Sequence, residues 1–205
     1  ILTHIRYSGK VFIMSKLLLI IIIAFSFHSL TNADDINDFE IEGMSVGDSL
    51  LNYVDEAKII KNIRSYYENF SSDNFYATGL SEDFFKVYDS VDIHLKKNDS
   101  KYKIYSLDGL IFYEDINACY KKMNSITKEL SNQFINTKEI DYGTTKHEAD
   151  NSGDSTVKTT SWYLESGDVI SIECYYWSEK MKKNRGWGDH LRISVTKKKL
   201  MDWLI

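Results

Sequence analysis

The sequence predicts an α+β fold, a two-layer sandwich in which helices pack on one face of an antiparallel sheet of about five strands. Three patterns lead to this prediction. Apolar residues alternate with polar ones over 85–95, recur every three or four residues over 116–134, and alternate again in three segments between 157 and 196. The resulting order of helix, hairpin, helix and three-stranded meander favours sheet and helix layers.

Two short helices are expected near the start of the folded region. Ser45 and Asp48 have the spacing of a capping box, and the acidic residue suits the positive end of a helix, so a helix should begin at Val46. Asp55 is expected to cap a second helix over 56–64, which has an isoleucine stripe.

The segments before and after these two helices are expected to be extended strands and loops. Residues 39–42 are expected to be a short extended piece, and 65–81 a loop with a short edge strand, because neither shows a sustained period. The alternating segment 85–95 is typical of a half-buried strand, and a turn at 97–100 leads into a returning strand over 102–107. The two strands therefore predict a hairpin.

The clearest helical pattern covers 116–134. Its apolar residues fall at spacings of three and four, which is one face of a helix: Ile116, Cys119, Met123, Ile126, Leu130 and Phe134. This stripe needs a partner surface, for which the sheet is the candidate. The polar, glycine-containing stretch 141–154 that follows is expected to be a loop.

Three strands complete the predicted sheet. They cover 157–164, 169–177 and 191–196, and a tight Ser166-Gly167 turn joins the first two. The tail 200–205 is expected to be a short amphipathic end whose tryptophan docks on the core.

The N-terminal hydrophobic run has the layout of a secretory signal peptide. An eleven-residue run, 17–27, that is apolar apart from Ser26 follows a lysine and leads to small residues, which predicts a signal peptide over 14–33 with cleavage after Ala33. A transmembrane helix needs about 18 apolar residues, so this run is too short to span a bilayer. Only an uncleaved signal peptide would attach the protein to a membrane.

Met14 begins a more conventional signal peptide than the first residue does, so 1–13 are expected to be translated upstream sequence. The remaining 34–205 are expected to form one α+β domain in the periplasm or outside the cell. Removing 1–33 takes away three of the 25 basic and none of the 30 acidic residues, which leaves a net charge of −8. Such a balance disfavours nucleic acid as a partner.

Cys119 and Cys174 are the two cysteines, and both fall on apolar faces of predicted elements. In an oxidising compartment they would form a disulfide, which closes a loop of about 55 residues and contributes roughly 4 kcal/mol. The alternative is a pair of buried thiols that behave as small apolar side chains. The sequence leaves both alternatives open, although the absence of C-x-x-C disfavours redox catalysis.

Ser45 lies in a G-x-S-x-G pattern, which is typical of the nucleophile of serine hydrolases. It falls too early in the chain to follow several strands, and the downstream Asp189-His190 pair has poor geometry for a triad. Helix capping explains the serine better. His94, His147 and His190 lack metal-ligand spacing, so no metal or cofactor is expected.

A basic segment between two tryptophans is the candidate binding surface. Residues 179–199 carry eight basic and two acidic side chains, in contrast to the acidic remainder of the mature chain. The predicted contacts to a partner come from two aromatic anchors and three cations: Trp177, Lys182, Lys183, Arg185 and Trp187. An anionic envelope component or another exported protein would fit this surface, while a solvated basic loop is the simpler alternative.

Gly43-Met44-Ser45, which opens the first predicted helix, resembles small exported helix-plus-hairpin proteins of the SmpA/BamE and beta-lactamase-inhibitor-protein type. The resemblance covers about twenty residues and implies an interaction module of the cell envelope. The lipid-attachment cysteine and the Gly-Pro of SmpA/BamE proteins are missing here. The sequence therefore predicts an exported, non-enzymatic binding or protein-interaction module, and the alternative is a small exported hydrolase that uses Ser45 or His190.

Overall fold

The computed structural model describes residues 36–65, 74–134 and 137–204, all of which belong to one compact unit, Thr31–Ile205. The predicted signal peptide, its cleavage point after Ala33 and the segment 1–13 lie outside the described residues. Within the described ranges, no helix combines the length and the apolar character needed to cross a membrane.

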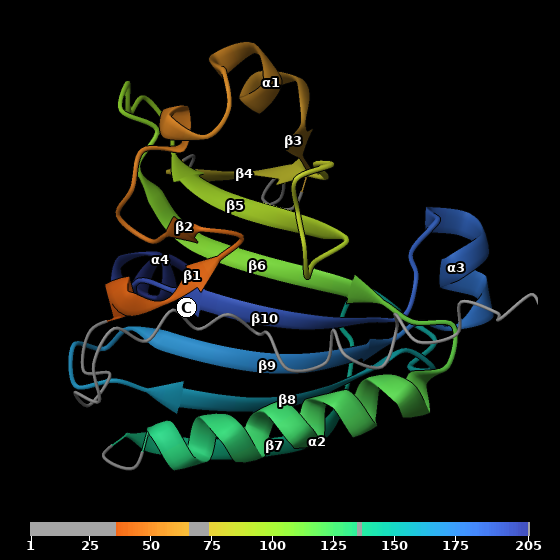
Figure 1. The fold of residues 1–205 in the computed structure, drawn as a ribbon. Coiled ribbons are helices and arrows are strands. Elements are labelled where there is room, and N and C mark those ends of the chain that lie inside the picture. The colour runs from red at the N-terminus through yellow and green to blue at the C-terminus, as the bar shows by residue number, and fades with distance from the viewer. Residues whose placement is uncertain (1–35, 66–73, 135–136, 205) are drawn as a thin grey trace, which may run out of the picture. The chain divides into compact units, whose positions relative to one another are not determined.

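An eight-stranded antiparallel sheet forms the centre of the fold, with the strand order β3-β4-β5-β6-β10-β9-β8-β7 (Figure 1). Its strands are β3 (Ile63–Arg64), β4 (Phe75–Leu80), β5 (Ser90–Lys96), β6 (Ile104–Phe112), β7 (Lys138–Lys146), β8 (Thr156–Tyr163), β9 (Val169–Tyr176) and β10 (His190–Thr196). A separate two-stranded sheet pairs β1 (Glu40–Ile41) with β2 (Met44–Ser45). The mixed α and β content is as predicted, but the prediction of about five strands is wrong.

Helices connect and flank these strands. They are α1 (Glu56–Lys61), α2 (Ile116–Gln133), α3 (Glu179–Arg185) and α4 (Lys198–Leu204), with 3-10 turns at η1 (Ile36–Asp38) and η2 (Leu50–Asn52). Asp55 caps α1 as predicted, because its carboxylate accepts a hydrogen bond from Lys58 N at 2.8 Å. Ser178 caps α3, and Gly186 ends it in the left-handed conformation at φ 69°.

The predicted helix beginning at Val46 is absent, and only the three-residue turn η2 forms there. Ser45 belongs to β2 instead of capping a helix. Its backbone N–H donates to Asp48 Oδ2 at 3.1 Å, and its hydroxyl donates to Phe39 O at 3.1 Å. The Ser-x-x-Asp spacing therefore stabilises a turn after β2.

Two predicted loops contain strands. Residues 141–154 were expected to be irregular, but β7 covers the first part as the outer strand of the sheet, exposed along most of its length and bulged at Gly143. Apart from Ile140 and Tyr142 its side chains are polar, so the strand shows no sustained apolar alternation. Similarly, β4 lies inside the sheet between β3 and β5. The basic segment between Trp177 and Trp187, which precedes β10, contains the short helix α3.

Helices lie on both faces of the sheet, so the expectation that they pack on one face is wrong. α2 packs against β9 and β10 on the apolar face, the face that carries Ile172, Cys174 and Leu191 (Figure 1). α4 instead packs beside β6 on the opposite face, where Leu200 is buried and Trp203 contacts Phe75. We call this opposite face the polar face.

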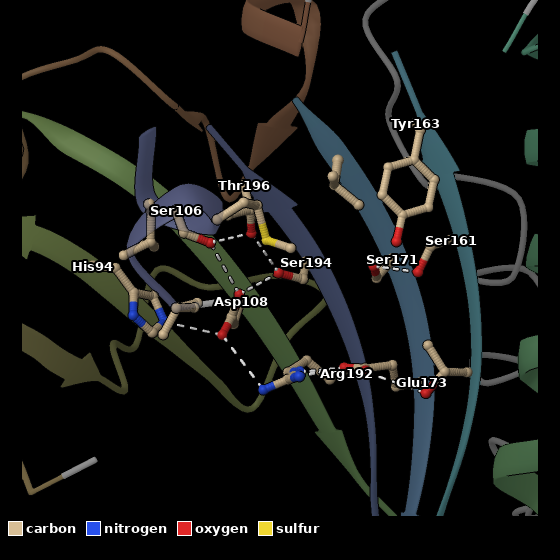
Figure 2. A pocket seen from close by; sticks show the side chains of 15 residues that line it. His94, Ser106, Asp108, Ser161, Tyr163, Ser171, Glu173, Arg192, Ser194 and Thr196 are labelled. Carbon is tan, nitrogen blue, oxygen red and sulfur yellow. Dashed lines mark hydrogen bonds and ion pairs between the residues drawn. The ribbon is translucent and has the colours of Figure 1, made fainter. Parts of the chain in front are cut away.

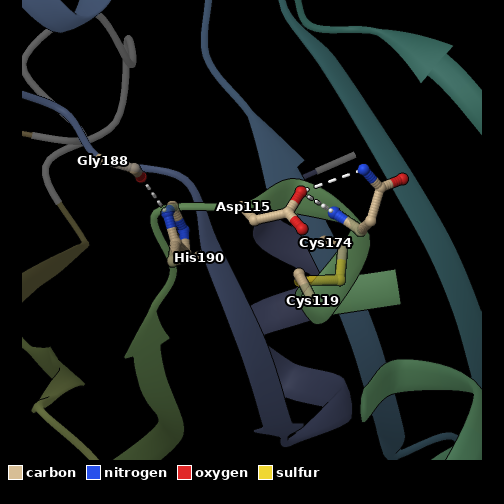
Figure 3. Close-up of a disulfide and its surroundings, with 6 residues drawn as sticks. Asp115, Cys119, Cys174, Gly188 and His190 are labelled. Carbon is tan, nitrogen blue, oxygen red and sulfur yellow. Dashed lines mark hydrogen bonds between the residues drawn. A yellow bond between two sulfur atoms is a disulfide. The ribbon is translucent and has the colours of Figure 1, made fainter. Parts of the chain in front are cut away.

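Cys119 of α2 and Cys174 of β9 form a disulfide with their Cα atoms 6.0 Å apart (Figure 3). Both residues are fully buried. The disulfide alternative is therefore confirmed, and the alternative of two free thiols is wrong. The bond joins the long helix to the centre of the sheet on the apolar face.

Candidate binding site on the polar face of the sheet

Four adjacent strands place charged and hydroxyl side chains on the polar face. The strand register sets Arg192 opposite Glu173, and Ser194 opposite both Asp108 and Ser171. A polar sheet face exposed to water is ordinary in an antiparallel sheet, but here the acidic groups are buried, and the Arg192 side chain is only 33% exposed. Asp108 is 5% exposed and Glu173 is 9% exposed. Such burial requires that every charge has a partner inside the protein.

Asp108 is the centre of the first part of the network (Figure 2). Its Oδ2 accepts a hydrogen bond from His94 Nε2 at 3.0 Å, and its Oδ1 accepts one from the Ser194 hydroxyl at 2.6 Å. Burial works against ionisation of Asp108, but the charges of His94 and Arg192 and the bonds from His94 and Ser194 outweigh it. They hold the pKa of this carboxyl well below its usual range.

Arg192 joins this carboxylate to Glu173. Its Nε donates to Glu173 Oε2 at 2.5 Å, its Nη2 pairs with the same oxygen, and its Nη1 lies 3.7 Å from Asp108 Oδ2. Tyr175 and Thr159 also donate their hydroxyls to Glu173. Burial alone would lower the pKa of Arg192, but the neighbouring carboxylates of Glu173 and Asp108 raise it well above its usual value.

A chain of hydroxyls extends from Asp108 along the polar face. An ionised carboxylate only accepts hydrogen bonds, so Ser194 has to be the donor in its bond to Asp108. Ser106 also donates to Asp108 Oδ1, at 3.3 Å. Thr196 lies 3.0 Å from Ser194 and 2.7 Å from Ser106, whose protons are already used, so Thr196 donates to one of these two hydroxyls. The protons of these hydroxyls are consequently all used inside the network.

A cavity of about 310 Å³ opens above this network. Its floor is the polar face of the sheet, including Ser161, Ser171 and Tyr163 from β8 and β9, as Figure 2 shows. One wall is apolar and comes from Leu200, Met201 and Leu204 of α4, while Val169 adds an apolar side chain to the floor beside Tyr163. The cavity thus offers hydrogen-bonding groups on one side and an aliphatic surface on the other.

An aromatic stack connects the network to the end of the sheet near α3. The Arg192 guanidinium lies over the Tyr175 ring, 5.0 Å from its centroid, and the His190 ring stacks on Tyr175 at 4.6 Å. His190 Nδ1 donates to the Gly188 carbonyl at 2.8 Å, because a carbonyl oxygen only accepts (Figure 3). Burial lowers the pKa of His190 to about 4.

The low pKa of His190 predicts acid sensitivity of the fold. The unfolded chain takes up a proton on this ring near pH 6.5, whereas the folded protein does so only near pH 4. The free energy of unfolding should therefore fall by roughly 3 kcal/mol as the pH is lowered across this window. In urea unfolding at several pH values, His190→Phe should show a flatter profile than the wild type. Equal slopes for both proteins would contradict this account.

The sequence-predicted binding residues lie at α3, outside the cavity lining. Trp177 and Trp187 contact each other with ring centroids 4.5 Å apart, and Arg185 lies over Trp187 at 5.9 Å. Lys182 turns inward, where its ammonium bonds Asp189 at 3.0 Å. Lys183 remains exposed. The structure thus brings the tryptophans and Arg185 together, and it neutralises Lys182 within the protein.

The two residues of the hydrolase alternative belong to separate elements, β2 for Ser45 and β10 for His190. The Ser45 hydroxyl bonds Phe39 O, and the His190 ring bonds Gly188 O. Among the described hydrogen bonds, none joins this serine to a histidine. The described residues also contain no group of three side chains that could hold a metal ion.

Sequence reasoning missed the network of Asp108, Glu173 and Arg192. A signal was present, because Arg192, Ser194 and Thr196 alternate with the apolar residues of one strand. What the alternation cannot show is that Asp108, on a strand 86 residues before Ser194, lies beside it in the sheet.

Comparison with known proteins gives no relative to which this site can be matched. No family model, no curated protein and no solved structure matches the chain. The interpretation of the site therefore rests on its geometry.

Proposed function

We propose that this chain is an exported, non-enzymatic binding module that holds a small molecule in the cavity on the polar face of its sheet. One observation carries the proposal. Three buried ionisable side chains, His94, Asp108 and Glu173, and the partly buried Arg192 bond one another beneath a cavity, although apolar side chains in their place would stabilise the fold without needing partners. Pockets for small molecules combine apolar walls with a few fixed polar groups in this way.

The hydrogen bonding favours binding over acid–base catalysis. Each oxygen of Asp108 and Glu173 already accepts at least one bond from the protein's own donors. A general acid or base has to reach the substrate with a free oxygen or proton. These carboxylates instead fix the positions of Arg192 and of the hydroxyl chain.

Export is supported by the disulfide between Cys119 and Cys174, because such bonds persist mainly in oxidising compartments. It agrees with the signal peptide predicted over 14–33, and it favours the periplasm or the outside of the cell.

A second candidate function uses the surface at α3. Trp177 Nε1–H is buried without a hydrogen-bond partner among the described residues, and Trp187 beside it is 36% exposed. We propose this surface as a contact for another exported protein or an anionic envelope component. Lys183→Glu with Arg185→Glu should weaken binding to vesicles of anionic lipid, and unchanged binding would reject the anionic partner.

A small-molecule screen tests the proposed function. Ligand-observed NMR with a library of neutral, anionic and cationic fragments should find binders of the wild type. These binders should be lost in Ser171→Phe and in Met201→Trp, which fill the cavity from the sheet and from α4. Binding by both filled variants as strong as that of the wild type would contradict the proposal, provided that both variants unfold cooperatively.

A further inference from the structure

We infer that the ligand of the cavity is a neutral, hydroxyl-rich molecule, with the chemistry of a sugar ring. The inference rests on the proposed function and specifies the class of molecule that the cavity binds. It follows from three properties of the lining: its charge balance, its remaining hydrogen-bonding groups and its apolar wall.

The charge balance excludes anionic and cationic ligands. Arg192 is the one basic lining side chain besides His94, and both Asp108 and Glu173 already pair with it. An anion would meet these two carboxylates and a guanidinium that is already neutralised. A cation would find carboxylate oxygens already bonded to Ser194, Thr159 and other donors. Taking an ion out of water without a new partner is unfavourable.

Neutral hydroxyls provide the hydrogen-bonding groups that remain. Ser161 and Ser171 bond each other at 2.7 Å, and this bond uses only one of their two hydroxyl protons. The Tyr163 and Tyr142 hydroxyls form a second such pair at 2.7 Å. In Figure 2 the Tyr163 hydroxyl points toward Ser161 and Ser171. This corner of the cavity thus offers both donors and acceptors, the combination that binds ligand hydroxyls.

The hydrogen bond to Tyr142 is the largest cause of the raised pKa of Tyr163, and burial raises it further. Tyr163 therefore keeps its proton at neutral pH, and the Tyr142–Tyr163 pair has one hydroxyl proton beyond the one in its own bond.

The apolar wall complements the carbon-bound hydrogens of a sugar ring. Leu200, Met201 and Leu204 of α4 form this wall, and Val169 adds an apolar side chain beside Tyr163 in the sheet. A pyranose has hydroxyls around its edge and C–H groups on its faces, so it matches both sides at once. The volume of about 310 Å³ is at the lower end of the range for small-molecule pockets, roughly 300–1,000 Å³.

Calorimetric titration with a matched set of sugars tests the inference. D-glucose, D-galactose, D-mannose and N-acetyl-D-glucosamine are the neutral probes, D-glucuronate is the anionic probe, and D-glucosamine is the cationic probe. At least one neutral sugar should bind the wild type more tightly than either charged analogue does. Maltotriose and chitotriose show whether the site takes a free sugar or the end of a glycan chain.

Matched variants locate the binding. Ser161→Ala with Ser171→Ala removes both partners of one hydrogen bond, so it leaves no orphaned group and should preserve stability. It should weaken binding of the neutral sugar about tenfold, equivalent to about 1.4 kcal/mol. Ser125→Ala, on the exposed side of α2, should leave binding unchanged.

Tighter binding of a charged analogue, or equal affinity of the double variant and the wild type, would overturn the assignment to neutral polyols. Absence of binding by every neutral sugar would do the same. The binding function itself would stand if charged fragments bind the wild type and not the filled variants, so the two failures are distinguishable.

Discussion

Replacing Arg192 by leucine is expected to destabilise the folded protein by roughly 3–5 kcal/mol, because it leaves Asp108 and Glu173 buried without their shared cation. Urea denaturation of the purified protein at neutral pH measures the loss. Arg185→Leu is the matched control, because Arg185 is exposed on α3 and its loss should change stability by less than about 1 kcal/mol.

Removing the orphaned charges should restore stability. Combining Arg192→Leu with Asp108→Asn and Glu173→Gln should recover most of the lost free energy, since the cost arises from uncompensated charge. If Arg192→Leu is no more destabilising than Arg185→Leu, the ion pairs of Arg192 with Asp108 and Glu173 do not stabilise the folded protein, which would contradict the prediction.

Reduction of the Cys119–Cys174 disulfide is expected to lower the free energy of unfolding by about 4 kcal/mol, because the bond closes a loop of 55 residues in the unfolded chain. Denaturation with and without a reductant measures this difference. Cys119→Ala with Cys174→Ala is the control, and its stability should not respond to reductant. Identical unfolding midpoints for oxidised and reduced wild type would contradict the prediction.

Local sequence patterns correctly predicted the features that depend on a single helix or strand. Asp55 caps α1 because the cap depends on four neighbouring residues. The α2 stripe and the alternation in β9 correctly placed Cys119 and Cys174 on facing surfaces. Both elements bury one side against the other, and burial of this kind produces periodicity in the sequence.

Elements without such a buried side were missed. The outer strand β7 pairs through its backbone and exposes most of its side chains, so its sequence is that of a loop. The buried network was missed for a different reason, because Asp108 and Arg192 meet only when β6 pairs with β10. The pairing of strands distant in sequence, and the presence of α4 on the polar face, are properties of the whole fold.

The central claim, that the polar-face cavity is a ligand site, is tested most directly at Met201. Among the described methionines, Met201 alone lines the cavity, whereas Met123 is a buried residue of α2, on the apolar face of the sheet. With ¹³C-labelled methionine methyl groups, adding a neutral sugar should shift the Met201 signal in a saturable manner and leave Met123 unchanged. A Met201 signal that stays constant with every neutral, anionic and cationic probe would contradict the claim.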